Sequence, residues 1–143
     1  MAFIKIRKLN SITLKYFKMH NKDELKILNK AMDLAESIYL ITSKFPSNEI
    51  YDLTSQMRRC AVSIPSNIAE GAGRNSNNEF IRFLAFANGS SYELDIQLKL
   101  CERLVFISDE DLKDIFNNIN EIQKMNYKLQ EFLLKKTNET RKV

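Results

Sequence analysis

The sequence predicts an all-α fold, an antiparallel up-down-up-down four-helix bundle in which the second helix is kinked at Pro65. Apolar residues recur in steps of three and four along four long segments, which is the helical period. Three glycines and two prolines among 143 residues supply too little turn chemistry for a strand-rich fold. The connections are short, about 46–47, 72–75 and 106–107, and short connections make sequential helices antiparallel neighbours.

The first helix, over residues 25–45, carries two apolar stripes. The stripes are Ile27, Ala31, Leu34, Ile38, Ile41 and Phe45, and beside them Leu25, Leu28, Met32, Ala35 and Tyr39. At about 100° per residue they lie about 120° apart and cover an arc of about 200°, whereas a surface helix needs about 100°. The surplus apolar face predicts that the protein is an oligomer.

The second helix is expected to begin after Ser47 as N-cap, with Glu49 in its first turn. Its apolar seam consists of Ile50, Leu53, Met57, Cys60, Ile64 and Ile68. Pro65 removes one amide and clashes with the carbonyl four residues earlier, so we expect a kink in the turn before it. Gly71 or Gly73 is expected to end the helix in the left-handed conformation.

Capping residues mark the third and fourth helices. Ser76 and Glu79 form an S-x-x-E capping box, and Ser108 precedes three acidic residues. The third seam is Phe80, Leu84, Ala87, Ser91, Leu94, Leu98, Cys101 and Val105, and the fourth is Leu112, Ile115, Ile119, Ile122, Asn126, Leu129 and Leu133. Glycine inside a helix costs about 1 kcal/mol relative to alanine, so Gly89 predicts a close approach of another backbone.

The charge is unevenly distributed along the chain. The net charge is +4, but residues 1–22 carry +6, residues 135–143 carry +3, and residues 23–134 between them carry −5. We therefore expect a basic N-terminal extension (1–22), a bundle (23–136) and a basic C-terminal tail (137–143). Lys135 and Lys136 suit the negative end of a helix dipole. The basic ends are either solvated tails or places where a polyanion binds.

Several kinds of chemistry lack the residues that they require. His20 is the only histidine, so one chain cannot supply a catalytic triad or a multi-histidine metal site. Cys60 and Cys101 lie on apolar seams. On antiparallel helices they would be offset along the axis by about 13 residues, which disfavours a disulfide between them. We expect no enzyme, no cofactor and no metal. No apolar run approaches the ~18 residues that span a bilayer, and with no secretory segment the expected location is the cytoplasm.

Residues 57–93 are unusually polar for packed helices. Antiparallel helices joined near residue 74 bring together positions whose numbers sum to about 148. This register predicts two ion pairs, Glu70 with Arg82 and Arg59 with Glu93. An alternative of equal weight is that Arg58, Arg59 and Arg74 contact a ligand.

The same segment contains the runs R-R-x-A-V-S-I-P-S-N-I-A-E-G, G-R, E-F-I-R-F-L and G-S-x-x-E-L. Over roughly residues 22–134 the chain resembles the four-helix-bundle family of 23S rRNA intervening-sequence proteins, which are small bacterial proteins. The resemblance implies a homopentamer with no established enzymatic activity. A related group, the accessory variability determinants of diversity-generating retroelements, implies binding to a reverse transcriptase and to nucleic acid. The sequence departs from the family at Asn88, where many members carry arginine, and at Cys60, where alanine is usual.

Two functions follow from these observations. The leading one is a non-enzymatic homo-oligomeric module, pentameric by the resemblance, that binds RNA or a nucleic-acid-handling partner such as a reverse transcriptase. Its candidate contacts are Arg58, Arg59, Arg74, Lys135 and Lys136. The other motif positions have structural roles: Ser63, Pro65, Asn67, Glu70, Gly71, Arg82, Gly89, Ser90 and Glu93. The alternative, favoured by the acidic middle and by Asn88, is a protein–protein scaffold without direct nucleic-acid contact.

Overall fold

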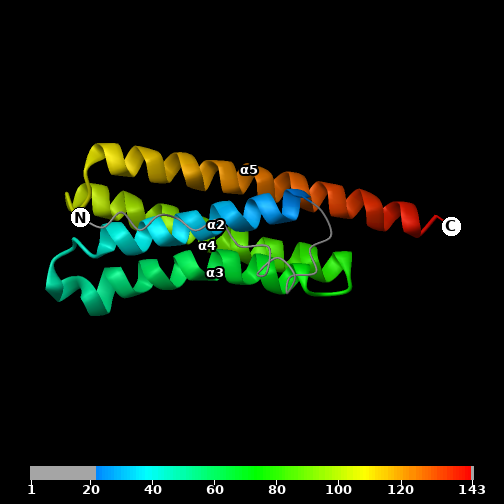
Figure 1. Cartoon of the computed structure of the whole chain (residues 1–143), viewed down its shortest axis with the longest axis horizontal. Helices are drawn as coiled ribbons and strands as arrows, with labels where there is room; N and C mark the ends of the chain where they lie inside the picture. Colours follow the sequence, from blue (N-terminus) through cyan, green and yellow to red (C-terminus); the bar gives the residue numbers. More distant parts are fainter. Residues whose placement is uncertain (1–21, 143) are drawn as a thin grey trace.

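The computed structural model describes residues 22–142, and in them four long helices lie side by side as an all-α four-helix bundle (Figure 1). The helices are α2 (Lys22–Thr42), α3 (Ser55–Ala72), α4 (Asn77–Arg103) and α5 (Asp109–Thr140). The predicted all-α four-helix bundle is thereby confirmed, and its up-down-up-down order stays a prediction. The interpretation of the segment before α2 as a basic extension lies outside the described residues.

The predicted seams form the core of the bundle. The buried apolar side chains include Ile27, Leu34 and Ile38 of α2, Met57, Ile64 and Ile68 of α3, Leu84, Leu94 and Leu98 of α4, and Ile115, Ile119 and Ile122 of α5. One seam residue was predicted wrongly. Val105 is 84% exposed and has φ 58°, because α4 ends before it and the chain turns away from the core.

The bundle buries part of the second apolar stripe of α2 and leaves the rest exposed to solvent. Leu28 and Ala35 are buried within the bundle, whereas Met32 and Tyr39 are exposed. The bundle therefore covers part of the face that the sequence assigned to a neighbouring copy. The apolar face that α2 leaves to solvent is narrower than predicted.

The second predicted helix does not run unbroken from Ser47. Ser47–Glu49 forms a 3-10 turn (η1), Ile50–Thr54 forms a π-helical turn (η2), and Asp52 has non-helical angles of φ −103° and ψ −105°. Helix α3 then begins at Ser55 without a side-chain cap from Thr54. Pro65 lies buried inside α3, and a kink there stays a prediction.

The turn from α3 to α4 contains the close packing that had been expected at Gly89. A Cβ atom on Gly71 would lie 2.7 Å from Phe83 Cβ and 2.8 Å from Phe80 Cδ2, so only glycine fits there without movement. At Gly89 nothing lies within 4 Å of such an atom, so the predicted close approach is wrong within one chain. Helix α3 ends near the predicted position, but no glycine among the described residues is left-handed, and Gly73 has φ −75°.

The serine caps predicted for the third and fourth helices are present, whereas Ser47 lies in η1 and does not cap α3. Ser76 Oγ accepts a hydrogen bond from the Glu79 amide at 3.3 Å, and Ser108 Oγ accepts one from the Asp111 amide at 3.3 Å. Each bond satisfies a backbone donor that the first turn of the helix leaves unpaired.

Helix α5 is longer than the sequence indicated. It continues to Thr140, so the predicted boundary after residue 136 lies inside the helix, and Lys135 and Lys136 are not in its last turn. The final turns project past the end of the α3–α4 pair (Figure 1). This extra length places basic side chains of α5 beside the turn between α3 and α4.

The register of α3 against α4 differs from the predicted one. Three side-chain contacts define it: Ser63 Oγ with Ser90 Oγ at 2.9 Å, Gln97 Nε2 with Cys60 Sγ at 3.6 Å, and Cys101 Sγ with Met57 Sδ at 3.5 Å. Facing positions therefore sum to between 153 and 158 rather than 148. Residue numbers rise along α3 as they fall along α4 in these three contacts, so α3 and α4 are antiparallel.

Both predicted ion pairs are wrong, although their positions lie within a residue or two of the observed Ser63–Ser90 register. Glu70 pairs with Arg74 at 3.1 Å, and Arg82 pairs with Glu79 at 3.8 Å on its own helix. Among the ion pairs of the described residues, none joins Arg59 to Glu93. All of these partners face solvent, so the charges of this segment do not form a buried network.

Polar contacts hold α5 against α2 and α4. Asn126, on the seam of α5, donates through Nδ2 to the Leu84 carbonyl oxygen at 2.9 Å and is thus satisfied although it is buried. Lys30 of α2 pairs with Glu121 of α5, and the hydrogen bond from Lys30 lowers the pKa of Glu121.

Candidate nucleic-acid interface

A concave polar surface lies where α3 turns into α4 and the last turns of α5 pass beside them. It consists of two adjoining cavities of about 400 and 350 Å³ that share Asn75, Ser76 and Asn77. We call this surface the turn groove. Its lining residues are Glu24, Arg74, Asn75, Ser76, Asn77, Asn78, Phe80, Phe132, Leu133, Lys136, Thr137, Thr140 and Arg141.

Cations outnumber anions in the turn groove. Arg74 comes from the turn, Lys136 comes from α5, and Arg141 is the C-cap residue directly after α5. The buried Glu24 is the one carboxylate among the lining residues. The remaining polar groups are exposed amides and hydroxyls, which can donate and accept hydrogen bonds. Such a surface suits an anionic, oxygen-rich ligand.

Two of the three cations, Arg74 and Lys136, lie over neighbouring aromatic rings. Arg74 extends over Phe83, with Cζ 5.2 Å from the ring centroid, while it pairs with Glu70. Lys136 Nζ lies 4.6 Å from the centroid of Phe132, one turn earlier on α5. Cation–π contacts of this kind restrain a long side chain yet leave its charge exposed.

The start of α4 adds to the positive potential of the turn groove. Ser76 caps a helix of 27 residues, and the groove includes Ser76 together with Asn77 and Asn78 of the first turn. The free amides of a helix N-terminus carry partial positive charge and bind phosphate oxygens in many proteins. This feature supports the lysine and arginine side chains and does not replace them.

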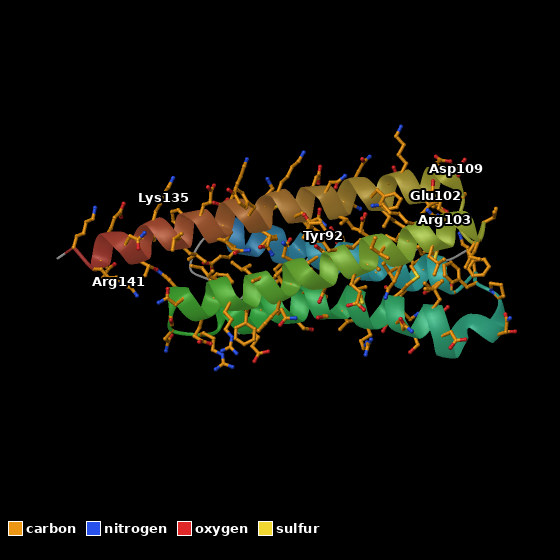
Figure 2. All side chains as sticks on the ribbon, turned by 180° about the vertical axis from the view of Figure 1, so that it is seen from behind. Tyr92, Glu102, Arg103, Asp109, Lys135 and Arg141 are labelled. Atoms are coloured by element: carbon orange, nitrogen blue, oxygen red, sulfur yellow. The ribbon has the colours of Figure 1, made fainter. Side chains whose placement is uncertain are left out.

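The structure brings together only part of the predicted contact set. Arg74 and Lys136, distant in sequence, line the same cavity. Lys135 is exposed on the projecting part of α5, where Figure 2 shows it near Arg141, and it does not line the groove.

Arg58 and Arg59 lie elsewhere, and they differ from each other. Arg58 Nε donates to Thr42 Oγ1 at 2.9 Å, and its Cζ lies 4.7 Å from the Tyr39 ring centroid, so this side chain joins α3 to α2. Arg59 is exposed, one residue from the buried Cys60. Neither residue lines the turn groove.

Sequence reasoning missed Arg141 and Phe132, two residues of the groove. Arg141 was assigned to a tail, although no glycine or proline follows residue 89 to stop the last helix. Phe132 was read only as part of a helical segment. Their proximity to Arg74 depends on the length and placement of α5, which no local pattern encodes.

A second surface lies on the outward side of α4, away from the turn. Its members follow one another at steps of four and are all exposed: Tyr92, Ile96, Leu100 and Leu104, with Ile96 at 65%. We call these four residues the apolar stripe. Figure 2 shows Tyr92 midway along α4 and Glu102 and Arg103 at the end opposite to Lys135 and Arg141.

The described residues contain no cluster of three or more His, Cys, Asp or Glu side chains that could hold a metal ion. Burial, and after it a hydrogen bond with Glu93, raises the pKa of the Cys60 thiol to about 11. Cys60 is therefore a neutral thiol at physiological pH, which is the unreactive form. Among the described helices, none combines the length and the apolar character that a membrane crossing requires.

Comparison with known proteins identifies the family. The family model of the 23S rRNA-intervening sequence protein matches residues 23–128. The chain belongs to the 23S rRNA-intervening sequence protein family. The match confirms the resemblance to this family, whereas the relation to the retroelement accessory proteins stays a prediction. The matched range includes Arg74 but ends before Phe132, Lys136 and Arg141.

A solved structure shares the fold of this family member. It is the crystal structure of a protein of unknown function from the S23 ribosomal protein family of Bacteroides thetaiotaomicron. The two chains are 24% identical and superpose with a TM-score of 0.69 over 76% of this chain and 98% of that chain. Similarity at this level of identity shows the fold alone. No curated protein matches the chain.

Proposed function

We propose that this family member is a non-enzymatic, homo-oligomeric helical module that binds nucleic acid through the turn groove. One observation carries the proposal: Arg74, Lys136 and Arg141 reach one concave surface from two separate parts of the chain. Phosphate contacts of lysine, arginine, exposed amides and helix N-termini position a protein on nucleic acid without reading its sequence. The turn groove offers all four kinds of contact.

Oligomerisation is supported by the apolar stripe. Ile96, Leu100 and Leu104 expose aliphatic side chains along one face of α4, and Met32 and Tyr39 of α2 are exposed as well. Contiguous exposed apolar patches mark interaction sites. The homopentamer that the family resemblance implies would carry five turn grooves on one particle and would gain affinity for a long polyanion through multivalency.

A reverse transcriptase or another nucleic-acid-handling protein belongs to the same proposal as a second partner. The oligomer would then hold the nucleic acid at its turn grooves and the protein at another surface. Arg59 and Lys135, which are exposed and do not line the groove, are candidate contacts for either partner.

A salt titration tests nucleic-acid binding. We would measure fluorescence anisotropy of a labelled 20-base-pair RNA hairpin between 50 and 200 mM salt. Three phosphate contacts for each chain predict that affinity falls about 40-fold over this range. The double variant K136Q/R141Q should lose about two units of the salt slope, whereas R103Q, at the other end of α4, should match the wild type. Absence of binding at ~50 mM salt would refute the proposal.

The competing function is a protein–protein scaffold without nucleic-acid contact. The net charge of −5 over residues 23–134 favours it. A pull-down from the native cell, with and without nuclease, separates the two functions. A protein partner that survives nuclease and binds K136Q/R141Q normally would support the scaffold.

A further inference from the structure

Two arginine side chains flank two aromatic rings on the surface beside the turn groove. Arg74 lies over Phe83 at 5.2 Å, Phe83 contacts Phe86 with ring centroids 5.8 Å apart, and Arg82 lies over Phe86 at 5.5 Å. The order is therefore guanidinium, ring, ring, guanidinium. We call these four side chains the cation–aromatic ladder.

The ladder is anchored at one ring and open at the other. Phe83 packs against Gly71 in the α3–α4 contact and is half-buried, whereas Phe86 is 49% exposed. The rings meet at 86°, and such an edge-to-face contact leaves at least one face of each ring free of the other ring. A flat ligand can therefore stack on Phe86 or on a guanidinium group without displacing Phe83.

The acidic side chains beside the ladder leave its arginine groups accessible to a ligand. Glu70 pairs with Arg74 and Glu79 with Arg82, but the two arginine side chains remain 50% and 64% exposed. Ion pairs at this exposure contribute little and weaken in salt. A phosphate strand can replace these carboxylates as the partner of the guanidinium groups.

We propose that the cation–aromatic ladder binds the unpaired bases of a single-stranded nucleic acid, while the turn groove holds the adjoining phosphates. The inference rests on the proposed function, because Arg74 belongs to both surfaces. Every nucleobase has a flat π face, and proteins bind single strands by stacking bases on aromatic rings and on arginine. Bases inside a duplex are already stacked on one another and cannot stack on the ladder. A duplex therefore contacts only the turn groove. Stacking of one base changes affinity by roughly 5- to 100-fold.

The test compares single strands with a duplex on matched variants. The probes are a labelled 12-nucleotide RNA of adenosines, the DNA strand of the same sequence, and the RNA strand paired with its complement. F86L removes the ring but keeps an apolar side chain on the exposed face, and R82K keeps the charge but removes the planar group. The controls are Y127L, which removes an exposed ring on α5, and R103K at the far end of α4.

Wild type should bind the single strand at least 5-fold more tightly than the duplex. F86L and R82K should weaken single-strand binding 5- to 100-fold and leave duplex binding within 2-fold, with both controls unchanged. The strand, RNA or DNA, that loses the larger factor identifies the ligand of the ladder.

Three results would overturn the inference: equal loss for strand and duplex, no loss in either variant, or an F86L protein whose mass by light scattering differs from that of the wild type. The last result would mean that Phe86 packs against a second copy. Failure of the proposed function looks different, because wild type would then bind neither the duplex nor the strand.

Discussion

The outward face of α4 exposes apolar side chains along its whole length, but their neighbours differ between its two halves. Cations accompany them in one half and other apolar side chains in the other. In the half next to the turn, Phe86 is exposed beside Arg82, and the pair continues to Phe83 and Arg74. In the far half, Ile96 and the rest of the apolar stripe expose mainly aliphatic side chains, which cannot hold a cation as a ring does. One helix thus presents a surface suited to a polyanion and a surface suited to another apolar face.

The packing beneath these halves differs as well. Under the turn half, α3 and α4 approach so closely that Gly71 leaves no room for a side chain against Phe80 and Phe83. Under the far half, the contact is made by sulfur and amide groups: Cys60 with Gln97 and Met57 with Cys101. The ladder rests on the contact in which Phe83 packs directly on Gly71, and this anchoring favours a preorganised stacking site.

The largest effect is expected from a charge in the apolar stripe. L100D should convert the proposed oligomer to a 16.7 kDa monomer, because an unpaired carboxylate would be buried at the proposed interface. Affinity for a long RNA should fall 100-fold or more as multivalency is lost. Light scattering and anisotropy measure the two effects.

The matched control is Y127D, which places a carboxylate at an exposed position on α5. It should keep the mass of the wild type. An L100D protein with unchanged mass would remove the assigned role of the stripe and with it the contrast between the halves of α4.

Two glycine substitutions test the packing on each side of that contrast. G71A should lower stability by about 2–3 kcal/mol, because the new Cβ would overlap Phe83 and Phe80. For a chain of this length, the melting temperature should fall by about 6–10 °C. Differential scanning fluorimetry is sufficient to measure it.

G89A is the counterpart, and whether it raises or lowers stability tests whether a neighbouring subunit packs at this position. Within one chain the position is open, so alanine should raise stability by about 0.5–1 kcal/mol through helix propensity. A fall in stability that disappears in the L100D background would instead place a neighbouring subunit against Gly89. The interface would then extend toward the ladder, and the two halves would no longer be separate surfaces.

The sequence predicted the seams of the bundle far better than the register between them. Seam positions such as Leu84 and Ile119 follow from local periodicity, which each helix carries by itself. A heptad pattern matches itself after a shift of seven residues, so the register of α3 on α4 could move from 148 to between 153 and 158 without exposing an apolar seam. The predicted ion pairs failed for a different reason, because Glu70 and Arg82 pair with residues four and three positions away along the chain rather than with each other.

The candidate site was predictable only in its parts. Arg74 and Lys136 were singled out as cations, but their meeting in one groove depends on where α5 lies and how far it continues. Phe83 and Phe86 were overlooked because the sequence does not show which side chains lie beside them. Only the turn between α3 and α4 places Arg74 over Phe83. Val105 shows the opposite error, in which a pattern was extended past the end of its helix.

An alkaline titration tests the far half of the α3–α4 contact. The pKa of Cys60 is raised from 9.0 to about 11 in the folded protein, so below pH 9 the thiol is neutral in both states and contributes no pH dependence. Between pH 9 and 11 the unfolded chain releases a proton that the folded chain retains. Stability should therefore fall by about 1–2 kcal/mol as pH rises through this window.

The variant C60A isolates this contribution from lysine and tyrosine titration. Urea unfolding of both proteins at pH 8 and pH 10.5 should show a steeper loss for the wild type than for C60A. Parallel losses would mean that Cys60 is hydrated, and the contact would be looser than the structure shows.

The smallest change in stability is expected from R74Q, in the turn half. Arg74 pairs with Glu70 on the surface, where both side chains are half exposed, so unfolding in urea should shift by less than about 0.5 kcal/mol. Binding should respond far more, because Arg74 serves both the groove and the ladder: we expect a several-fold loss of RNA affinity and a salt slope reduced by about one unit. R58Q supplies the reverse case, since Arg58 donates to the buried Thr42 and lies over the ring of the exposed Tyr39, which joins α3 to α2. It should cost about 1–2 kcal/mol of stability and leave RNA affinity unchanged. If R58Q weakened binding as much as R74Q, the nucleic-acid surface would extend along α3 into the far half, and the functional division of α4 would have to be redrawn.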